Sequence, residues 1–197
     1  GAYQNTPISC TSTGIGAPSL AIAVEELSRI GVETFIRVGT CGAIQKNMRC
    51  GDIVISTGAV RLDGASKDYV IPEYPAVAHH LVVEALIQAA KELKMRYHVG
   101  ITASTDTFYC GQGRPGYRNY VSGQKEHVLT DMQKAGVLNF EMEGSCLFTL
   151  SSLFGKRAGM VCVIVGNRVT NKFLITDSMQ KQVGFVASRA VAILASK

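Results

Sequence analysis

Two glutamates separated by a single methionine, Glu141 and Glu143, lie between an apolar, strand-like run and a helix-like run. In α/β folds ligands bind at the carboxyl ends of the strands, so carboxylates at such a junction can face a binding site. A carboxylate accepts two hydroxyl hydrogen bonds at once, and with an apolar neighbour it suits a sugar. Alternatively both acids simply begin the helix, because acidic side chains are favoured at its positive end. This stretch alone leaves the two interpretations equally open.

A third charged residue, Arg37, lies near the end of an otherwise apolar run and is followed by Gly39 and Thr40. Buried arginine is unusual unless it is paired. A guanidinium beside a glycine turn and a threonine hydroxyl would make a good clamp for phosphate or another oxyanion. The alternative is an arginine that pairs with an acid of the core. The glycines match neither a Walker loop nor the dinucleotide fingerprint.

Two aromatic residues, an amide and a second arginine follow another strand-like run, as Phe108, Tyr109, Gln112 and Arg114. An aromatic face stacks on a planar ring. Glutamine and arginine together offer the donors and the acceptor that match a pyrimidine's carbonyl, N–H, carbonyl edge. The alternative is a polar loop tip that the aromatic residues anchor.

The composition predicts a single globular domain. The chain has 197 residues, of which 47% are hydrophobic and 18% charged, enough for one core but not for two ordinary domains. No apolar run reaches the roughly 18 residues that span a bilayer, and the start has no signal-peptide pattern. Six cysteines show no metal-ligand spacing, and most lie in apolar surroundings, which is typical of reduced core thiols in a cytosolic protein. The net charge of +5 is scattered, which argues against nucleic acid and permits a small anionic substrate.

The elements that must position these residues alternate between strands and helices. Residues 63–69 read as a polar loop, and the continuous apolar run 158–166 is typical of a central strand covered on both faces. The first strand, helix and second strand would form a parallel unit with a right-handed crossover. Strands are expected at 7–12, 33–38, 51–57 with 59–62, 97–103 and 158–166, and helices at 20–30, 76–95 (the longest), 129–135 and 177–195.

Four motifs together resemble the nucleoside phosphorylase family, in its uridine phosphorylase branch, over nearly the whole chain. The motifs are Arg37-Val38-Gly39-Thr40, Val60-Arg61-Leu62-Asp63-Gly64-Ala65-Ser66, Asp106-Thr107-Phe108-Tyr109 with Gln112 and Arg114, and Asn139-Phe140-Glu141-Met142-Glu143. The resemblance implies one α/β domain over residues 1–197. It also implies a mixed, mostly parallel central sheet flanked by helices on both faces, in a three-layer arrangement. The implied reaction is reversible phosphorolysis of uridine to uracil and ribose 1-phosphate.

The same resemblance assigns roles to individual residues. Phosphate would be bound by Arg37, Gly39 and Thr40. Ribose would be held by Glu141, Met142 and Glu143. The base would contact Phe108, Gln112, Arg114, Phe140 and Arg168, and the catalytic residues would be Arg37, Glu143 and Arg114. No cofactor is expected beyond phosphate as co-substrate, and no metal apart from a monovalent cation that some members hold near the positions of Ile15 and Ser19. Homodimers, often joined into a hexamer as a trimer of dimers, are the family's assemblies.

One departure from the family keeps a second functional class open. Family members begin with a further strand and a loop that carries a glycine and an arginine for phosphate, and this chain starts beyond them. We therefore expect either an active phosphorylase or a truncated, non-catalytic member that binds nucleoside. A purine nucleoside phosphorylase is the other alternative. Purine-cleaving relatives carry an Asp after the central strand, where this chain reads Asn167-Arg168, and this difference favours a pyrimidine.

Overall fold

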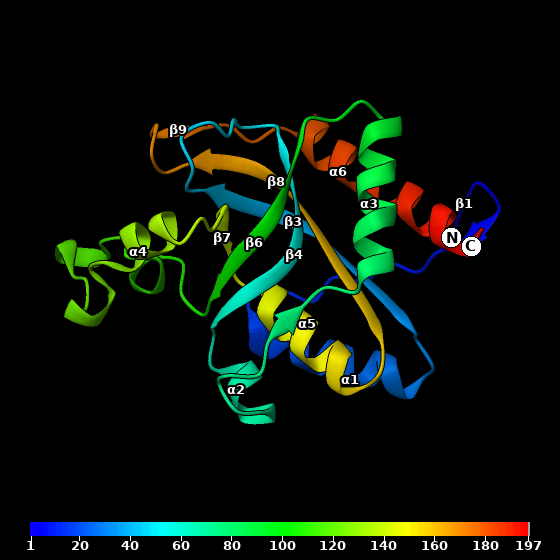
Figure 1. The fold of residues 1–197 in the computed structure, drawn as a ribbon, viewed down its shortest axis with the longest axis horizontal. Coiled ribbons are helices and arrows are strands. Elements are labelled where there is room, and N and C mark those ends of the chain that lie inside the picture. The colour runs from blue at the N-terminus through cyan, green and yellow to red at the C-terminus, as the bar shows by residue number, and fades with distance from the viewer. Residues whose placement is uncertain (197) are drawn as a thin grey trace.

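Seven strands form one mixed sheet in the computed structural model, which describes residues 1–196 (Figure 1). In spatial order they are β5 (Ala76–Val77), β4 (Ile53–Leu62), β6 (Tyr97–Thr105), β7 (Asn139–Glu141), β3 (Thr34–Ala43), β8 (Arg157–Asn167) and β9 (Lys172–Phe173). A separate pair joins β1 (Ala2–Tyr3) to β2 (Thr6–Pro7). The helices are α1 (Ala17–Arg29), α2 (Ala65–Tyr69), α3 (His80–Glu92), α4 (Val128–Lys134), α5 (Gly144–Leu153) and α6 (Asp177–Ala195), and three 3-10 turns are η1 (Cys110–Gln112), η2 (Tyr117–Asn119) and η3 (Gly123–Lys125).

The sheet closes partly on itself because β8 pairs with β4 as well as with β3. The pairs β3–β8, β4–β6 and β6–β7 are parallel, and β3–β7, β4–β5, β4–β8 and β8–β9 are antiparallel. The sheet is therefore mixed, as expected, whereas a mostly parallel arrangement is not confirmed. The antiparallel partners are mainly short segments, which need no helical crossover to reach their neighbours.

Helices cover both faces of the sheet, and the side chains of β8 alternate between them. Cys162 and Ile164 pack toward α1 and α5, and Val161 and Val163 pack toward α3 and α6. Such alternation follows from the two-residue period of a strand, and it explains why the strand reads as a continuous apolar run. The prediction of a central strand covered on both faces is thus confirmed. Figure 1 shows α1, α2 and α5 on one side of the sheet and α3 and α6 on the other.

Four local predictions were wrong. Residues 9–12 are exposed and lie outside any strand, so the expected first strand and its crossover are not found. Residues 76–77 form β5 against β4 instead of beginning a helix, which starts at His80. The longest helix is therefore α6, with 19 residues against 13 in α3. Residues 65–69 form α2 rather than a loop. The Asp63 carboxylate, just before this helix, accepts the Ser66 N–H of its first turn at 2.7 Å.

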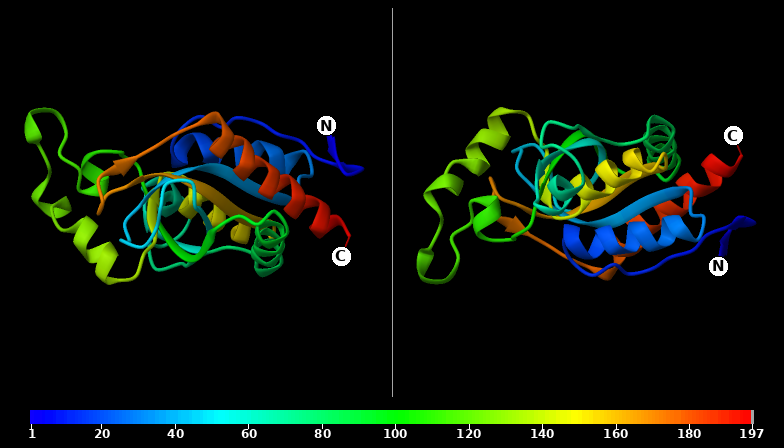
Figure 2. Two further views of the ribbon diagram at one scale, coloured as in Figure 1. Left: turned by 90° about the horizontal axis from the view of Figure 1, so that it is seen from above. Right: turned by 90° about the horizontal axis from the view of Figure 1, so that it is seen from below.

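Within residues 1–196, no helix combines the length and the apolar character that crossing a membrane requires. The segment that contains η1 to η3 and α4 projects from one end of the molecule, and both chain termini lie at the other end (Figure 2).

Candidate active site

Three of the predicted site residues converge on one another: Arg37 from β3, Glu141 from the end of β7, and Glu143 beside the start of α5. Nη2 of Arg37 donates to Oε2 of Glu143 and lies 3.4 Å from Oε2 of Glu141. The side chain of Arg37 is 15% exposed, and those of the two glutamates are 1% and 7% exposed. Arg37 is thus paired with acids in the core, and these acids are the ones that the sequence assigned to a sugar.

The local charges keep Arg37 ionised. Burial by itself lowers the pKa of Arg37, but Cys162 and the two glutamates outweigh that effect, and the pKa is raised above its ordinary value. A permanently charged guanidinium with some solvent exposure is suited to binding an anion.

The two glutamates have different surroundings. Both carboxylate oxygens of Glu141 accept main-chain N–H groups at the start of α5, those of Glu143 at 2.8 Å and of Gly144 at 2.9 and 3.0 Å. Glu141 therefore caps the helix, as the second interpretation of this stretch expected. The carboxylate of Glu143 turns away from the helix. Its Oε1 accepts the Gly16 N–H at 2.6 Å, and its Oε2 faces Arg37.

Gly16 belongs to the turn before α1 and has a φ of +97°, a backbone conformation that favours glycine. This turn carries the amide that orients Glu143, so the glycine-rich stretch near the start of the chain serves the site from 127 residues away.

Gly39 leaves room for the guanidinium of Arg37. A Cβ at this position would lie 2.5 Å from Nη1 of Arg37, closer than real contacts of this kind. Thr40, the next residue along β3, is exposed, and Met142 between the two glutamates is half-buried. Of the predicted phosphate and ribose residues, Gly39, Glu141 and Glu143 therefore lie directly beside the partly exposed guanidinium of Arg37.

The residues predicted to contact the base form a second group around the segment after β6. The Arg114 guanidinium lies 4.6 Å from the centre of the Phe108 ring, and Nε of Arg114 is buried without a hydrogen-bond partner among the described residues. Arg168, beyond the end of β8, donates to the main-chain carbonyls of Gln112 and Gly113.

Arg168 also lies 6.0 Å above the ring of Phe140. Phe140 itself is fully buried in a cluster with Ile44 and Ala103, so its side chain supports Arg168 from below. Burial, and secondarily the neighbouring Arg114, lowers the pKa of Arg168 to about 10. The two guanidiniums thus create a region of unfavourable positive charge that an anion would relieve.

The two groups are neighbours through β7, in which Phe140 directly precedes Glu141. No hydrogen bond or ion pair in residues 1–196 joins the Arg37 group to the Arg114 and Arg168 group. The structure thus brings Arg37, from within β3, together with Glu141 and Glu143 at the carboxyl end of β7. The base residues form a separate group beyond the carboxyl ends of β6 and β8.

A buried polar network behind Glu141 was missed by the sequence reasoning. The Ser104 hydroxyl donates to Glu141 and accepts the Ser145 N–H at 2.8 Å, and the Ser145 hydroxyl donates to Asp63. Arg61, which is also buried, donates to surrounding main-chain carbonyls. Asp63 and Arg61 lie in the motif at residues 60–66, one of the four that resemble the nucleoside phosphorylase family. This motif was the sequence signal that could have pointed to the network. Ser104 gave none, because its pairing with Glu141 in neighbouring strands is not visible in the sequence.

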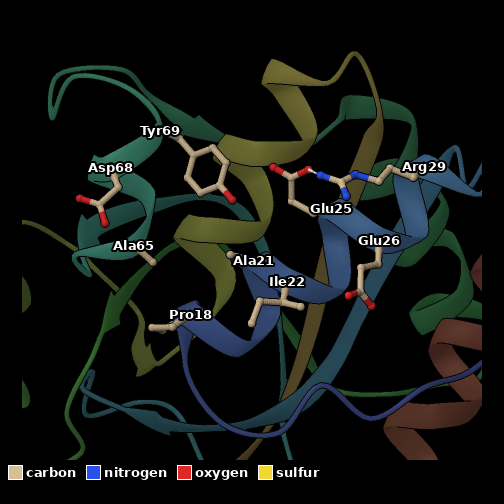
Figure 3. A pocket seen from close by; sticks show the side chains of 9 residues that line it. All are labelled: Pro18, Ala21, Ile22, Glu25, Glu26, Arg29, Ala65, Asp68 and Tyr69. Carbon is tan, nitrogen blue, oxygen red and sulfur yellow. Dashed lines mark hydrogen bonds and ion pairs between the residues drawn. The ribbon is translucent and has the colours of Figure 1, made fainter.

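The positions expected near a cation lie at the start of α1. Ile15 is 81% exposed, and the Ser19 hydroxyl donates to its main-chain carbonyl at 3.2 Å. Further along α1, an open hollow faces α2, and Glu25 pairs there with Arg29 (Figure 3). None of the predicted phosphate, ribose or base residues lines this hollow.

Comparison with known proteins agrees with this arrangement. The model of the phosphorylase superfamily matches residues 1–196. The chain is 55% identical to a uridine phosphorylase of Thermococcus kodakarensis over 195 residues, 99% of this chain and 70% of the relative. It is 46% identical to a uridine phosphorylase of Haemophilus influenzae, over 98% of this chain and 79% of that relative. It is also 42% identical to a guanosine phosphorylase of Halorubrum lacusprofundi, over 89% of this chain and 68% of that relative. The chain belongs to the phosphorylase superfamily.

Proposed function

We propose that this protein is an enzyme that catalyses the reversible phosphorolysis of uridine, giving uracil and ribose 1-phosphate. The observation that carries the proposal is the direct contact between Arg37, a group for an anion, and Glu143, a group for sugar hydroxyls. Phosphorolysis needs phosphate and ribose side by side, and positioning two reactants together supplies much of an enzyme's acceleration. The identities of 55% and 46% to uridine phosphorylases support the pyrimidine nucleoside as substrate.

The chemistry follows from where charge develops. Breaking the glycosidic bond leaves positive charge on the sugar and negative charge on the departing uracil. Phosphate held by Arg37, Gly39 and Thr40 lies beneath the sugar and stabilises its cation, and then forms the new bond to the anomeric carbon. Glu143 accepts the ribose hydroxyls, Met142 contacts the sugar, and the charge of the carboxylate favours the same cation.

The base group stabilises the departing uracil. Gln112 and Arg114 bind its polar edge, Phe108 stacks near its ring, and Arg168 contributes positive charge from above Phe140. The two neighbouring guanidiniums repel each other in the free protein, so an anion between them gains more than it would beside an isolated arginine. In this proposal the reaction needs no metal ion and no covalent nucleophile, and phosphate is the co-substrate.

Asn167 supports a pyrimidine over a purine. Its side-chain amide donates to the carbonyls of Gln45 and Met48, both at 2.8 Å, and its oxygen accepts the Val169 N–H at 2.9 Å. These bonds commit the side chain to the loop after β3, and an amide, unlike the carboxyl group of an Asp, has no proton to transfer to a purine nitrogen.

The assay is a substrate panel with phosphate: uridine, deoxyuridine, thymidine, inosine and guanosine. We expect uridine to have the highest kcat/KM. Gln112→Ala should lower it by two or more orders of magnitude while the phosphate KM changes little, because a site built on polar pairing fails when a partner is removed. Gln124→Ala, which alters an exposed glutamine of the same segment, is the control. Inosine or guanosine as the preferred substrate would overturn the pyrimidine assignment, and uridine binding without turnover would favour a non-catalytic nucleoside-binding role.

We further infer a cytoplasmic homo-oligomer, a dimer or a hexamer built as a trimer of dimers. Ile15 and Ile22, at the start and on the outer face of α1, are 81% and 62% exposed, which suits a protein interface. A monovalent cation near Ile15 and Ser19 would lie at this interface. All six cysteines are free, which suits a reducing compartment. Light scattering would test the assembly, and a monomer at micromolar concentration would contradict it.

A further inference from the structure

Cys162 lies beside the guanidinium of Arg37, next to Nη1. The glutamates face the other terminal nitrogen, Nη2. Nη1 of Arg37 donates to Sγ of Cys162 at 2.9 Å, with Sδ of Met160 at 3.6 Å. The sulfur atoms come from β8, the parallel neighbour of β3, in which Met160 is the partner of Arg37 and Cys162 the partner of Gly39. The guanidinium lies close over Gly39, where a Cβ would meet Nη1 at 2.5 Å, and it thereby reaches the thiol.

A second thiol supports the first. Cys41 and Cys162 are both buried, and a hydrogen bond joins them. This bond, together with the nearby Arg37, lowers the pKa of Cys162. Burial, with the bond to Cys162 as a further cause, raises the pKa of Cys41. The sulfur of Cys162 thus lies between the thiol of Cys41 on one side and the guanidinium of Arg37 on the other.

We propose that Cys162 is a positioning residue for phosphate binding, which holds the Arg37 guanidinium in the orientation that receives the anion. Glu143 fixes Nη2 and Cys162 fixes Nη1, so the plane of the guanidinium is set at both ends. A guanidinium held in this way loses less conformational freedom when phosphate binds. The proposal rests on the proposed function, in which Arg37 binds phosphate.

The chemical type of the partner matters. Arg37 already faces two carboxylates, and a third would cancel more of the charge that phosphate needs. A thiol is a weak acceptor, so it orients the nitrogen and leaves the positive charge available. Guanidinium carries five N–H donors in a fixed fork, and donors remain for the anion when one is directed to sulfur.

The test compares Cys162→Ala and Cys162→Ser with Cys146→Ala, which removes another fully buried thiol, on α5, for which the structure gives no contact with Arg37. For Cys162→Ala we expect the phosphate KM to rise roughly 3- to 10-fold, as for the loss of one ordinary hydrogen bond, with the uridine KM within about twofold. Cys162→Ser keeps an acceptor and should recover part of the loss. Cys146→Ala should leave both constants unchanged.

A direct measurement of phosphate affinity by calorimetry accompanies the kinetics, together with Arg37→Ala. If Arg37→Ala leaves phosphate binding unchanged, the proposed function fails at this residue. If Arg37→Ala weakens phosphate binding and Cys162→Ala does not, only the positioning role is overturned. Equal changes in the phosphate and uridine constants, or failure of both Cys162 variants to fold, would also overturn it, because each outcome would make the thiol a general packing group.

Discussion

Gly39 shows how one small residue determines the position of a functional side chain. Glycine has no Cβ, and the Arg37 guanidinium occupies the space where one would lie. A Cβ at residue 39 would be only 2.5 Å from Nη1 of Arg37. The resemblance had assigned this glycine to close approach of the phosphate. The geometry adds a second reason for a glycine, which the spacing of residues 37 and 39 does not reveal because neighbouring positions of this kind usually share a strand face without touching.

For Gly39→Ala we predict a folded protein that binds phosphate poorly. The obstructing atoms are the far end of a flexible side chain, so Arg37 can move and the melting temperature should fall by no more than about 3 °C, as expected for roughly 1 kcal/mol. Displacement from Glu143 and Cys162 should raise the phosphate KM at least tenfold. The control is Gly42→Ala in the same strand, where a Cβ would meet no atom within 4 Å. An unchanged phosphate KM in Gly39→Ala would contradict this account.

At the scale of an element, the start of α5 divides two tasks between two glutamates. Glu141 satisfies main-chain N–H groups of the first turn, and Glu143 faces Arg37 and Gly16. The two interpretations of this stretch, a helix start and a sugar site, thus apply to different residues. A sequence cannot make this distinction, because both are acids that stand just before the same helix.

Matched glutamine substitutions separate these tasks. Glu141→Gln places an amide N–H₂ against buried N–H donors, so it should cost about 1–3 kcal/mol of stability and several degrees in Tm. Glu143→Gln keeps an oxygen for the Gly16 amide and leaves Glu141 beside Arg37, so its Tm should fall less. Its kcat should fall roughly 100-fold, because the charge that favours the sugar cation is lost. Thermal unfolding and uridine kinetics on both variants decide the matter. A normal rate with a lowered Tm for Glu143→Gln would end its ribose assignment.

The elements that sequence reasoning placed correctly are those with long periodic patterns. The helix at 177–195 and the strand at 158–166 both agree with the structure. The errors fall on short segments whose state depends on distant partners. Ala76 and Val77 are helix-compatible, but they pair with Gly58 and Ala59 of β4. The pairing of β4 with β8, which partly closes the sheet, has no local signal at all.

On the scale of the whole molecule, the site is a junction between distant parts of the chain. Arg37 and Glu143 are 106 residues apart, and Arg37 and Cys162 are 125 apart. Residue types and the resemblance were enough to predict Arg37, Glu141 and Glu143 as site residues, and their convergence is observed. Cys162 was hidden, because a cysteine within a long apolar run reads as another core residue.

The last prediction concerns local stability, which should differ between the segment 106–127 and strand β8. The segment 106–127 contains only short 3-10 turns, and its Tyr117 and Tyr120 are 85% and 67% exposed. It projects from the sheet and is tied back by Arg168 through the carbonyls of Gln112 and Gly113. Strand β8, in contrast, is covered on both faces. Because amide exchange follows local opening, the segment should exchange much faster than β8.

Uracil together with phosphate should slow exchange in this segment, and phosphate alone should not. The reason is that the proposed base contacts Gln112 and Arg114 belong to the segment, whereas the proposed phosphate contacts lie within β3. Binding to the native state also stabilises the whole fold, by about 2.7 kcal/mol at 100 times Kd, so the segment must be compared with β8 in the same sample. Hydrogen–deuterium exchange by mass spectrometry resolves both. If bound uracil protects β8 and leaves residues 106–127 unchanged, the base lies elsewhere, and the assignment of Gln112 and Arg114 fails while that of Arg37 and Glu143 is unaffected.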